Sequence, residues 1–305
     1  MNNCHTSPST QWLLCDIQGQ SYALDVQQVL ELLSLRDIHI TPIPQTPAYV
    51  EGVISIRGKT LVILDFRTML GMQSMRQDTA EILQLLHDRE QDHVNWLNEL
   101  YASVRESREF QLATDPHRCK FGVWYDALMS DEEALSRFTN DQLSLLDLMS
   151  NFDRPHQQIH KVAIQVGELV AQGAVEEAVK LIDKARDTAL RELLDLFGKA
   201  REMVATLRRG VVIVVEFEGK RFGLLFDGAS DLHDFSHGTR QSSEVVGDDS
   251  PVGDFLHDEA TGILVQIIEL GNIANQHRTR QIAPESELAA DADVPVSEQL
   301  ESVAL

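Results

Sequence analysis

The chain has 305 residues, 43% of them hydrophobic, which is long enough for about two domains with ordinary buried cores. A net charge of -22 argues against nucleic acids and anionic membranes as partners, because phosphate binding needs clustered Lys and Arg, and it leaves proteins as the expected partners. We expect neither export nor membrane insertion but a cytoplasmic location, because no signal-peptide pattern opens the chain and apolar runs such as VVIVV are too short to span a bilayer. The three cysteines, Cys4, Cys15 and Cys119, are too few and too scattered for a disulfide framework, which agrees with a reducing compartment.

The first part of the chain has the pattern of a small β region. Residues 1–10 form a polar tail that we expect to be disordered, and residues 11–72 contain the short apolar runs WLLCDI, YALDV, VEGVISIRG and KTLVILDF between turn-forming segments. Cys15 alternates within the first run and is expected to be a buried strand residue without a role. The segment DVQQVLELL predicts a short helix in this region.

The middle of the chain is helical and separates two β segments. Residues 73–209 carry few prolines and long apolar seams, which predict a helical bundle, and residues 210–274 return to strands in VVIVVEFEGKRFGLLFDG and TGILVQIIELGNI. An acidic loop around GDDSPVGDFLHDE separates these runs, and residues 275–305 are expected to form a disordered acidic tail. Neither β segment of about sixty residues is self-sufficient, so we predict an α+β protein whose β domain is interrupted by a helical insertion.

Three histidines of the helical region are predicted to face a common interior. His156 and His160 are one helical turn apart and therefore share a face, which continues through Ala163, Gly167 and Val170. His93 falls on a seam with Ile82, Leu86, Leu97, Leu100 and Val104. A histidine at one such position is more often a satisfied core residue than a ligand, and it is the combination that indicates a site.

Cys119 would complete a metal shell. Asp115 is placed to cap, and Pro116 to open, a short helix whose first turn would hold the sulfur, and a helix N-terminus favours the thiolate that binds metals. One thiolate and three imidazoles suit tetrahedral zinc better than oxygen-preferring cations. Taken alone, such a cysteine is usually inert packing.

Catalysis is disfavoured by the same residues. Gln157 stands where an HExxH hydrolase needs its general-base glutamate, and four protein ligands leave no open position for water. The chain also lacks phosphate-loop, nucleophile-elbow and dinucleotide motifs, so we predict that it is not an enzyme.

The order of motifs in the insertion resembles the chemoreceptor zinc-binding domain, CZB, a small helical bundle. The matching motifs are HxxW at His93, CxFGxW at Cys119 and HxxxH at His156 and His160, although the stretch between Cys119 and His156 is longer than usual for the family. The resemblance implies that these four side chains hold zinc. It also implies that Cys119 is a redox-sensitive thiol that responds to zinc availability or to oxidants such as hypochlorous acid.

Both flanks resemble the CheW family of chemotaxis coupling proteins, whose fold is two small five-stranded β-barrels. The densest match runs from Thr46 to Arg67 and includes Pro47, Gly52, Arg57, Gly58 and Asp65. It implies a scaffold that joins the cytoplasmic tips of chemoreceptors to the regulatory domain of the histidine kinase CheA. The chain departs from the family in two ways. It has Leu-Val-Ile where the family usually has Pro-Val-Val before its Asp-Leu-Arg motif, and a helical bundle separates the two barrels.

Glu31 and Arg57 match a charged pair near the family's receptor contact surface, so they are candidate partner-binding residues. The alternative is an ordinary surface ion pair worth about 0.5 kcal/mol. The neighbouring Leu32 and Ile43 belong either to the core or to a contact surface.

We therefore predict a chemotaxis adaptor whose coupling responds to the metal or thiol state of its inserted bundle. Two alternatives remain open: a scaffold with a purely structural zinc, and a zinc- or oxidant-responsive regulator of another pathway, such as one with a diguanylate cyclase. A homodimer through the helical bundle is a further expectation.

Overall fold

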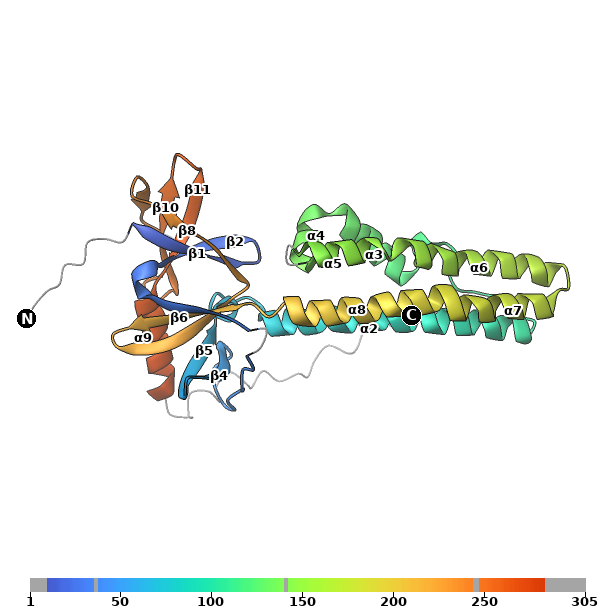
Figure 1. Cartoon of the computed structure of the whole chain (residues 1–305), viewed down its shortest axis with the longest axis horizontal. Coiled ribbons are helices and arrows are strands. Elements are labelled where there is room, and N and C mark those ends of the chain that lie inside the picture. The colour runs from blue at the N-terminus through green and yellow to red at the C-terminus, as the bar shows by residue number, and fades with distance from the viewer. Residues whose placement is uncertain (1–9, 36–37, 140–141, 244–246, 283–305) are drawn as a thin grey trace, which may run out of the picture.

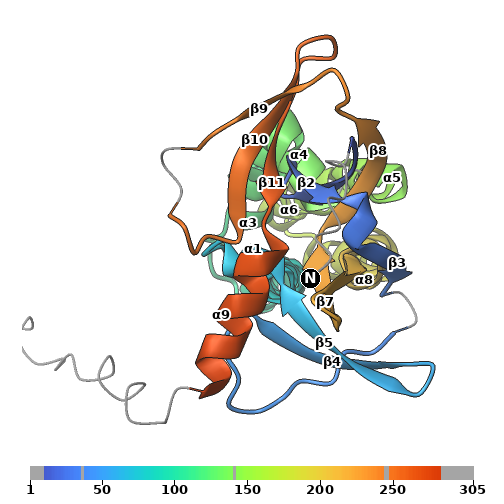
Figure 2. The same ribbon diagram turned by 90° about the vertical axis from the view of Figure 1, so that its left-hand side faces the viewer.

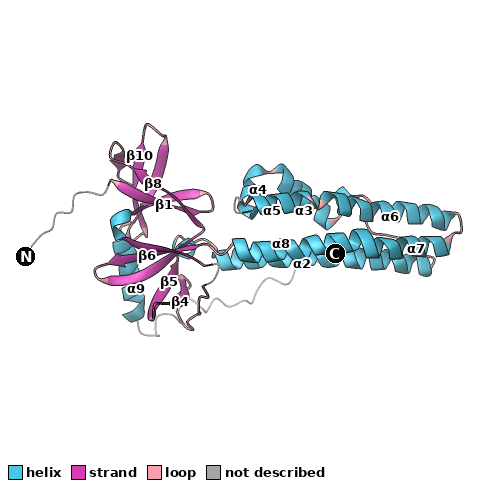
Figure 3. Cartoon of the chain, in the orientation of Figure 1, coloured by secondary structure: helices cyan, strands magenta, loops and turns pink. Residues whose placement is uncertain are grey.

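Two small β-sheets lie at one end of the molecule, and a long helical bundle extends away from them (Figure 1). The division between strands and helices is nearly complete, as colouring by secondary structure shows (Figure 3). The computed structural model describes residues 10–35, 38–139, 142–243 and 247–282. Among these, no helix is both long enough and apolar enough to cross a bilayer.

The first sheet combines strands from both ends of the chain. Its order is β8-β1-β2-β11-β10-β9, with β2 and β11 parallel and the other described pairs antiparallel. The strands are β1 (Gln11–Ile17), β2 (Gln20–Asp25), β8 (Gly228–Asp234), β9 (Thr239–Gln241), β10 (Val252–Asp258) and β11 (Ile263–Ile268). A tight turn joins β1 to β2, where Gln18 and Gly19 both take positive φ.

The second sheet is built in the same way. Its order is β3-β6-β7-β5-β4, and β5 pairs in parallel with β7. The strands are β3 (Val29–Ser34), β4 (Val50–Ile56), β5 (Lys59–Asp65), β6 (Val211–Phe217) and β7 (Lys220–Phe226). Because each sheet needs strands from both sides of the insertion, the prediction of one interrupted β domain is confirmed.

A shared core holds the two sheets together. Leu24 of the first sheet and Leu224 of the second are fully buried in one cluster, with Phe66 and Phe226 in contact at 4.9 Å between ring centroids. Helix α9 (Leu270–Ile282) follows β11 and lies at the end of the β part that faces away from the bundle (Figure 2).

The insertion leaves the second sheet after β5 and returns to it at β6. The short α1 (Phe66–Met69) leads to α2, and one continuous helical stretch, α7 to α8, brings the chain back alongside α2 (Figure 1). The elements are α2 (Met75–Arg105), α3 (Lys120–Ser130), α4 (Glu132–Thr139), α5 (Leu143–Ser150), α6 (Asp153–Ala171), α7 (Val175–Ala185), a π-helical segment (Arg186–Leu190) and α8 (Arg191–Leu207).

The ends and faces of these helices follow from the sequence. The Ser74 side chain accepts a hydrogen bond from the Gln77 N–H and so caps α2. His93 and the predicted apolar seam of α2 are buried, except that Ile82 is only partly buried. On α6, His156, His160 and Ala163 are buried as predicted, whereas Gly167 and Val170, farther along the helix, are exposed.

Four sequence expectations about elements need correction. The segment DVQQVLELL forms only a single 3-10 turn, Val26–Gln28, followed by strand β3, because its second half pairs with β6. The expected acidic loop contains strand β10. One sheet has six strands rather than five, owing to the short β9. Helix α9 continues past residue 274, where the tail was expected to begin; residues 1–9 and 283–305 of the two tails, including Cys4, lie outside the described residues.

Candidate metal centre

The four predicted ligands come together inside the bundle. His93 lies on α2, His156 and His160 on α6, and Cys119 at the start of α3, and their potential ligand atoms all lie within 4.8 Å of one another. The three histidines are buried and Cys119 is partly buried.

Cys119 is held at a helix start, one element later than expected. Asp115 caps a 3-10 turn, Pro116–Arg118, and Cys119 then serves as the N-cap of α3, where its sulfur accepts the Gly122 N–H at 3.2 Å. Gly122 makes this turn feasible, because a Cβ at that position would overlap the carbonyl oxygen of Pro116 and lie 2.8 Å from its carbonyl carbon. The glycine of the CxFGxW motif therefore allows the backbone to pass closely beneath the thiol.

The histidines present unpaired nitrogens to this thiol. His93 Nδ1 lies 2.7 Å from the carbonyl oxygen of Arg89, so Nδ1 carries the proton and Nε2 keeps its lone pair. His156 Nε2 lies 3.2 Å from the Cys119 sulfur. Among the described residues, His93 Nε2 and both ring nitrogens of His160 are buried and have no partner in good hydrogen-bond geometry, although backbone groups of Ala113 and Thr114 lie near His160. Buried polar atoms of this kind normally have a partner. A metal ion would supply one for His93 Nε2 and for one of the two nitrogens of His160.

Aromatic side chains surround the ligands. The Trp96 ring lies 4.8 Å from the His160 ring, and its Nε1 donates to the Ala113 carbonyl at 2.9 Å. Phe121 contacts His156 at 4.8 Å and His93 at 5.4 Å between ring centroids. These motif residues cover part of the cluster and pack against the imidazole rings.

The environment keeps the imidazoles neutral. Burial, and then the neighbouring His93 and His160, lowers the pKa of His156 to about 2. Burial, and then His93, lowers the pKa of His160 to about 4, and burial also lowers the pKa of His93. Neutral imidazole is the form that binds metals.

Without a cation nearby, the thiol is not predisposed to ionise. Burial raises the pKa of Cys119, while the backbone N–H groups of Gly122 and Phe121 oppose the rise. The N–H groups at the helix start therefore favour the thiolate, as the sequence predicts, but burial outweighs them. A bound cation would do so, because a coordinating thiol loses its proton.

The donor set and its geometry fit zinc. Tetrahedral zinc has Zn–N bonds of about 2.0 Å and Zn–S bonds of about 2.3 Å, so its ligand atoms lie roughly 3.3–3.6 Å apart. The spread of up to 4.8 Å between the four atoms is slightly wider, and small side-chain movements would close it. Bound zinc would hold the sulfur as thiolate and link α2, α3 and α6.

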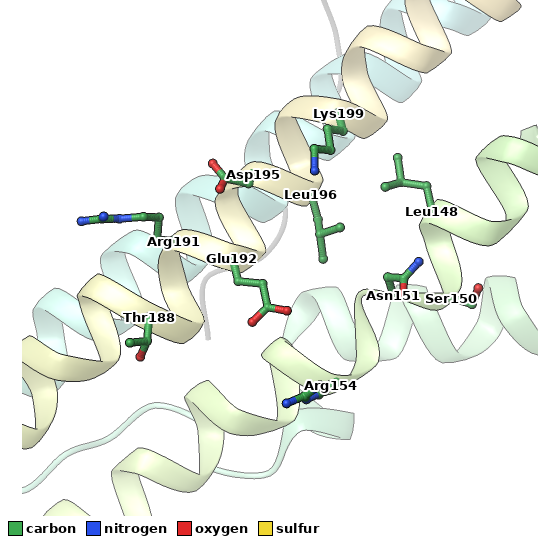
Figure 4. Close-up of a pocket in the computed structure, with 10 residues that line it drawn as sticks. All are labelled: Leu148, Ser150, Asn151, Arg154, Thr188, Arg191, Glu192, Asp195, Leu196 and Lys199. Carbon is green, nitrogen blue, oxygen red and sulfur yellow. The ribbon is translucent and has the colours of Figure 1, made fainter.

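Among the hollows on the described part of the bundle, one adjoins the cluster. A pocket of about 280 Å³ reaches His93, Cys119 and His160 past Trp96 and Phe121. A larger hollow of about 610 Å³ lies between α5, α6 and α8 (Figure 4). There Glu192 and Leu196 point from α8 toward the opposite helices. The lining combines acidic with basic side chains and includes none of the four predicted zinc ligands.

The predicted partner-binding pair is also formed. Arg57 Nη2 lies 3.4 Å from Glu31 Oε2, with the arginine side chain 84% exposed and the glutamate 34% exposed. Leu32 and Ile43 are 49% and 37% exposed, which places both at the surface rather than in the core. The role of this pair stays a prediction.

One contributor to the site was missed by the sequence analysis. Phe197 of α8 is fully buried and lies 6.1 Å from the His93 ring and 5.4 Å from the Phe121 ring. Phe197 lies far along the chain from the ligand motifs, so the sequence did not link it to the site. The only signal was its place on an apolar seam.

Comparison with known proteins finds two families in this chain. Residues 11–96 match the family model of the CheW-like domain, and residues 93–166 match that of the chemoreceptor zinc-binding domain. The matched segments thus meet within α2, where the insertion begins.

Curated relatives agree with the first match. A chemotaxis protein CheW of Rhizobium meliloti is 35% identical over 63 residues, which cover 19% of this chain and 41% of the relative. Chemotaxis proteins CheW of Thermotoga maritima and Helicobacter pylori are each 31% identical, over 22% and 20% of this chain and 44% and 36% of their own lengths. The chain therefore matches about two fifths of the length of these relatives.

A solved structure, that of the scaffolding protein TtCheW from Thermoanaerobacter tengcongensis, aligns with 12% identity and a TM-score of 0.38, covering 86% of this chain and 89% of that chain. The predicted combination is confirmed: a CheW-like domain and a chemoreceptor zinc-binding domain occur in one chain.

Proposed function

We propose that this chain is a non-enzymatic chemotaxis adaptor that couples chemoreceptor tips to the regulatory domain of a CheA histidine kinase, and that the metal centre of its insertion regulates this coupling. The CheW-like and zinc-binding domains support the two parts of the proposal. We place the adaptor in the cytoplasm, where Cys15 and Cys119 would remain free thiols.

The observation that carries the proposal is the way the metal centre is connected to the scaffold. His93 lies on α2, which begins directly after β5 and α1, and Phe197, which packs against His93, lies on α8, which returns directly to β6. Strands β5 and β6 belong to one sheet. A rearrangement of these helices would therefore act on a single sheet of the CheW-like part.

Cys119 is the group through which an oxidant would act. Hypochlorous acid would convert its thiolate to a sulfenic acid with release of chloride, and the sulfur would become a poorer ligand. The pocket beside His93, Cys119 and His160 gives a small neutral oxidant a path to the sulfur.

Binding measurements on the full chain test the proposal. We expect its affinity for the CheA regulatory domain or for a receptor tip fragment to differ between zinc-loaded and chelator-treated protein, and oxidant to reproduce the chelator effect. Cys119→Ala should bind as the chelator-treated protein does, with no further response. Equal affinities in all states would indicate a purely structural zinc, and no binding to CheA or receptor would point to another pathway.

A further inference from the structure

Four charged side chains form a cluster where the insertion meets the sheets. Arg67 of α1 makes two hydrogen bonds of 2.5 Å to Asp227, which follows β7, and both side chains are 3% exposed. Asp78 of α2 accepts from Arg67 at 3.2 Å and from Arg208, at the end of α8, at 2.5 Å. We call Arg67, Asp78, Arg208 and Asp227 the junction cluster.

The junction cluster joins the insertion to both sheets. Asp227 also accepts the N–H of Gln18 at 2.7 Å, in the turn between β1 and β2 of the first sheet. Arg67 follows β5 of the second sheet. The Asp78 carboxylate on α2 is shared by Arg67, which contacts both sheets through Asp227, and by Arg208 at the end of α8. It therefore connects the sheets to both helices.

A second set of contacts connects the junction cluster to the metal centre. Arg208 donates to the carbonyl oxygens of Arg137 and Phe138 on α4 at 2.5 and 3.2 Å. The Phe138 ring lies 5.8 Å from Trp124, and Trp124 lies 5.7 Å from Phe121. Phe121 in turn packs against the metal-ligand histidines His93 and His156.

The junction cluster pairs opposite charges, and the buried carboxylate of Asp65 interacts with its Arg67 and Asp227. Two guanidinium groups face two carboxylates, and a buried charge that loses its partner is strongly unfavourable. A cavity of about 560 Å³ adjoins the cluster between the β1–β2 turn and α4, so the interface is not tightly filled there. A movement of α4 would therefore change the contacts of Arg208, and through them those of Asp78, before the packing of the sheets opposes it.

We propose that Asp78 is the joint that transmits changes in the bundle to the seam between the two sheets. That the metal state causes the movement rests on the proposed function. That Asp78 transmits a movement of the bundle, whatever its cause, does not. In this view Trp124 and Phe138 carry the movement from the metal centre to Arg208, and Asp78 passes it to Arg67 and Asp227.

Hydrogen exchange of the full chain, followed by peptide, tests this joint with two perturbations of the bundle. One perturbation is removal of metal by a chelator. The other is Phe197→Leu, which loosens the packing against His93 while all four ligand side chains are retained. In the wild-type chain we expect each to raise the exchange of the β1–β2 turn, residues 17–20, by about fivefold or more. In Asp78→Asn, neither perturbation should change exchange there, while peptides containing His93 or His156 still respond.

Matched variants complete the design. Trp124→Leu leaves the junction cluster intact and interrupts the contacts upstream, so it should also abolish the response of the turn. Asp88→Asn, on the exposed side of α2, and the exposed Val123→Ala on α3 should respond as wild type does. A turn that ignores both perturbations in wild type, or still responds in Asp78→Asn or Trp124→Leu, overturns the joint. If metal analysis finds no bound metal, the proposed function fails while the Phe197→Leu arm still decides the joint.

Discussion

Without a bound metal, the four-ligand cluster would leave polar atoms in the bundle core without partners. His93 Nε2 and the His160 nitrogen that would bind zinc are buried without a partner in good hydrogen-bond geometry among the described residues, and each such atom costs about 1–3 kcal/mol. A structural zinc site contributes on the order of 10 kcal/mol at neutral pH, which exceeds this cost. The insertion should therefore be markedly less stable without metal, and this difference in stability is what a sensor needs.

Replacement of one ligand should remove the metal. We expect about one zinc per purified chain and its loss in His160→Ala, with a lower midpoint of thermal unfolding because three donors bind zinc more weakly than four. Metal analysis and calorimetry measure both effects. His87→Ala, an exposed histidine on α2, is the control and should retain metal. Wild-type protein without bound metal would contradict the assignment.

A change at Gly122 should disturb the thiol without altering a ligand. In Gly122→Ala the new methyl group would overlap the Pro116 carbonyl, so the turn that holds Cys119 must shift, and zinc affinity should fall at least tenfold, or about 1.4 kcal/mol. Competition with a chelating dye measures it. Gly198→Ala on α8 has open space around the new methyl group and should keep full affinity while stabilising the helix by about 0.5–1 kcal/mol. Equal affinities would show that the turn accommodates the methyl group.

The limits of sequence reasoning at this scale are physical. His156 and His160 are one turn apart on a single helix, so helical periodicity is enough to place them together. Gly122 matters because of a backbone atom that another segment brings near, and Phe197 because α8 folds back on α2. Contacts of this kind depend on tertiary structure and have no local signature.

At the level of whole elements, pairing partners overrode local pattern. The segment VLELL has a composition that suits a helix, but it lies beside β6 and alternates between partly buried and exposed residues as edge strand β3. Strand β10 was hidden because acidic residues interrupt it, and its pairing with β9 and β11 is what orders it. The long α2 was predictable since its seam persists over many turns.

One contact between strands should make the first sheet sensitive to acid. The hydrogen bond from His233 on β8, and then that from Thr261, lowers the pKa of Asp258 on β10 to about 2, against about 3.9 in an unfolded chain. A lowered folded pKa stabilises the protein above the unfolded value, and this contribution is lost as the pH falls from about 4 toward 2. The protection factors of β8 and β10 in hydrogen exchange, which correct for the intrinsic slowing of exchange in acid, should therefore fall across this range.

Variants separate this contact from general acid unfolding. Asp258→Asn should show the faster exchange of β8 and β10 already at neutral pH and a flatter dependence between pH 4 and 2. Glu259→Gln, at the exposed neighbouring position, should follow the wild-type profile. Identical profiles for wild type and Asp258→Asn would refute the role of this carboxylate.

On the scale of the molecule, the insertion enters and leaves the β part at one place. A Cβ on Gly210, which precedes β6, would lie 3.2 Å from the sulfur of Met75, the first residue of α2. The two ends of the bundle are therefore adjacent, and closing such a gap with a short loop costs little entropy. Each sheet combines strands from before and after the insertion, so the β part needs both flanks. The bundle contributes no strand to either sheet.

Excision of the bundle should consequently leave a folded CheW-like part. Replacing residues 76–208 by a short Gly-Ser linker removes Asp78 and Arg208 together, and Arg67 keeps its two hydrogen bonds to Asp227. We expect cooperative thermal unfolding, β-type circular dichroism and no bound zinc. A chain ending at residue 72 is the matched comparison and should be unfolded, because each sheet then lacks strands from the second flank.

If the excised chain binds the CheA regulatory domain at one affinity with and without chelator, then any metal dependence found in the full chain originates in the bundle. An excised chain that fails to fold would mean that the bundle is a structural part of the scaffold rather than a regulatory insertion.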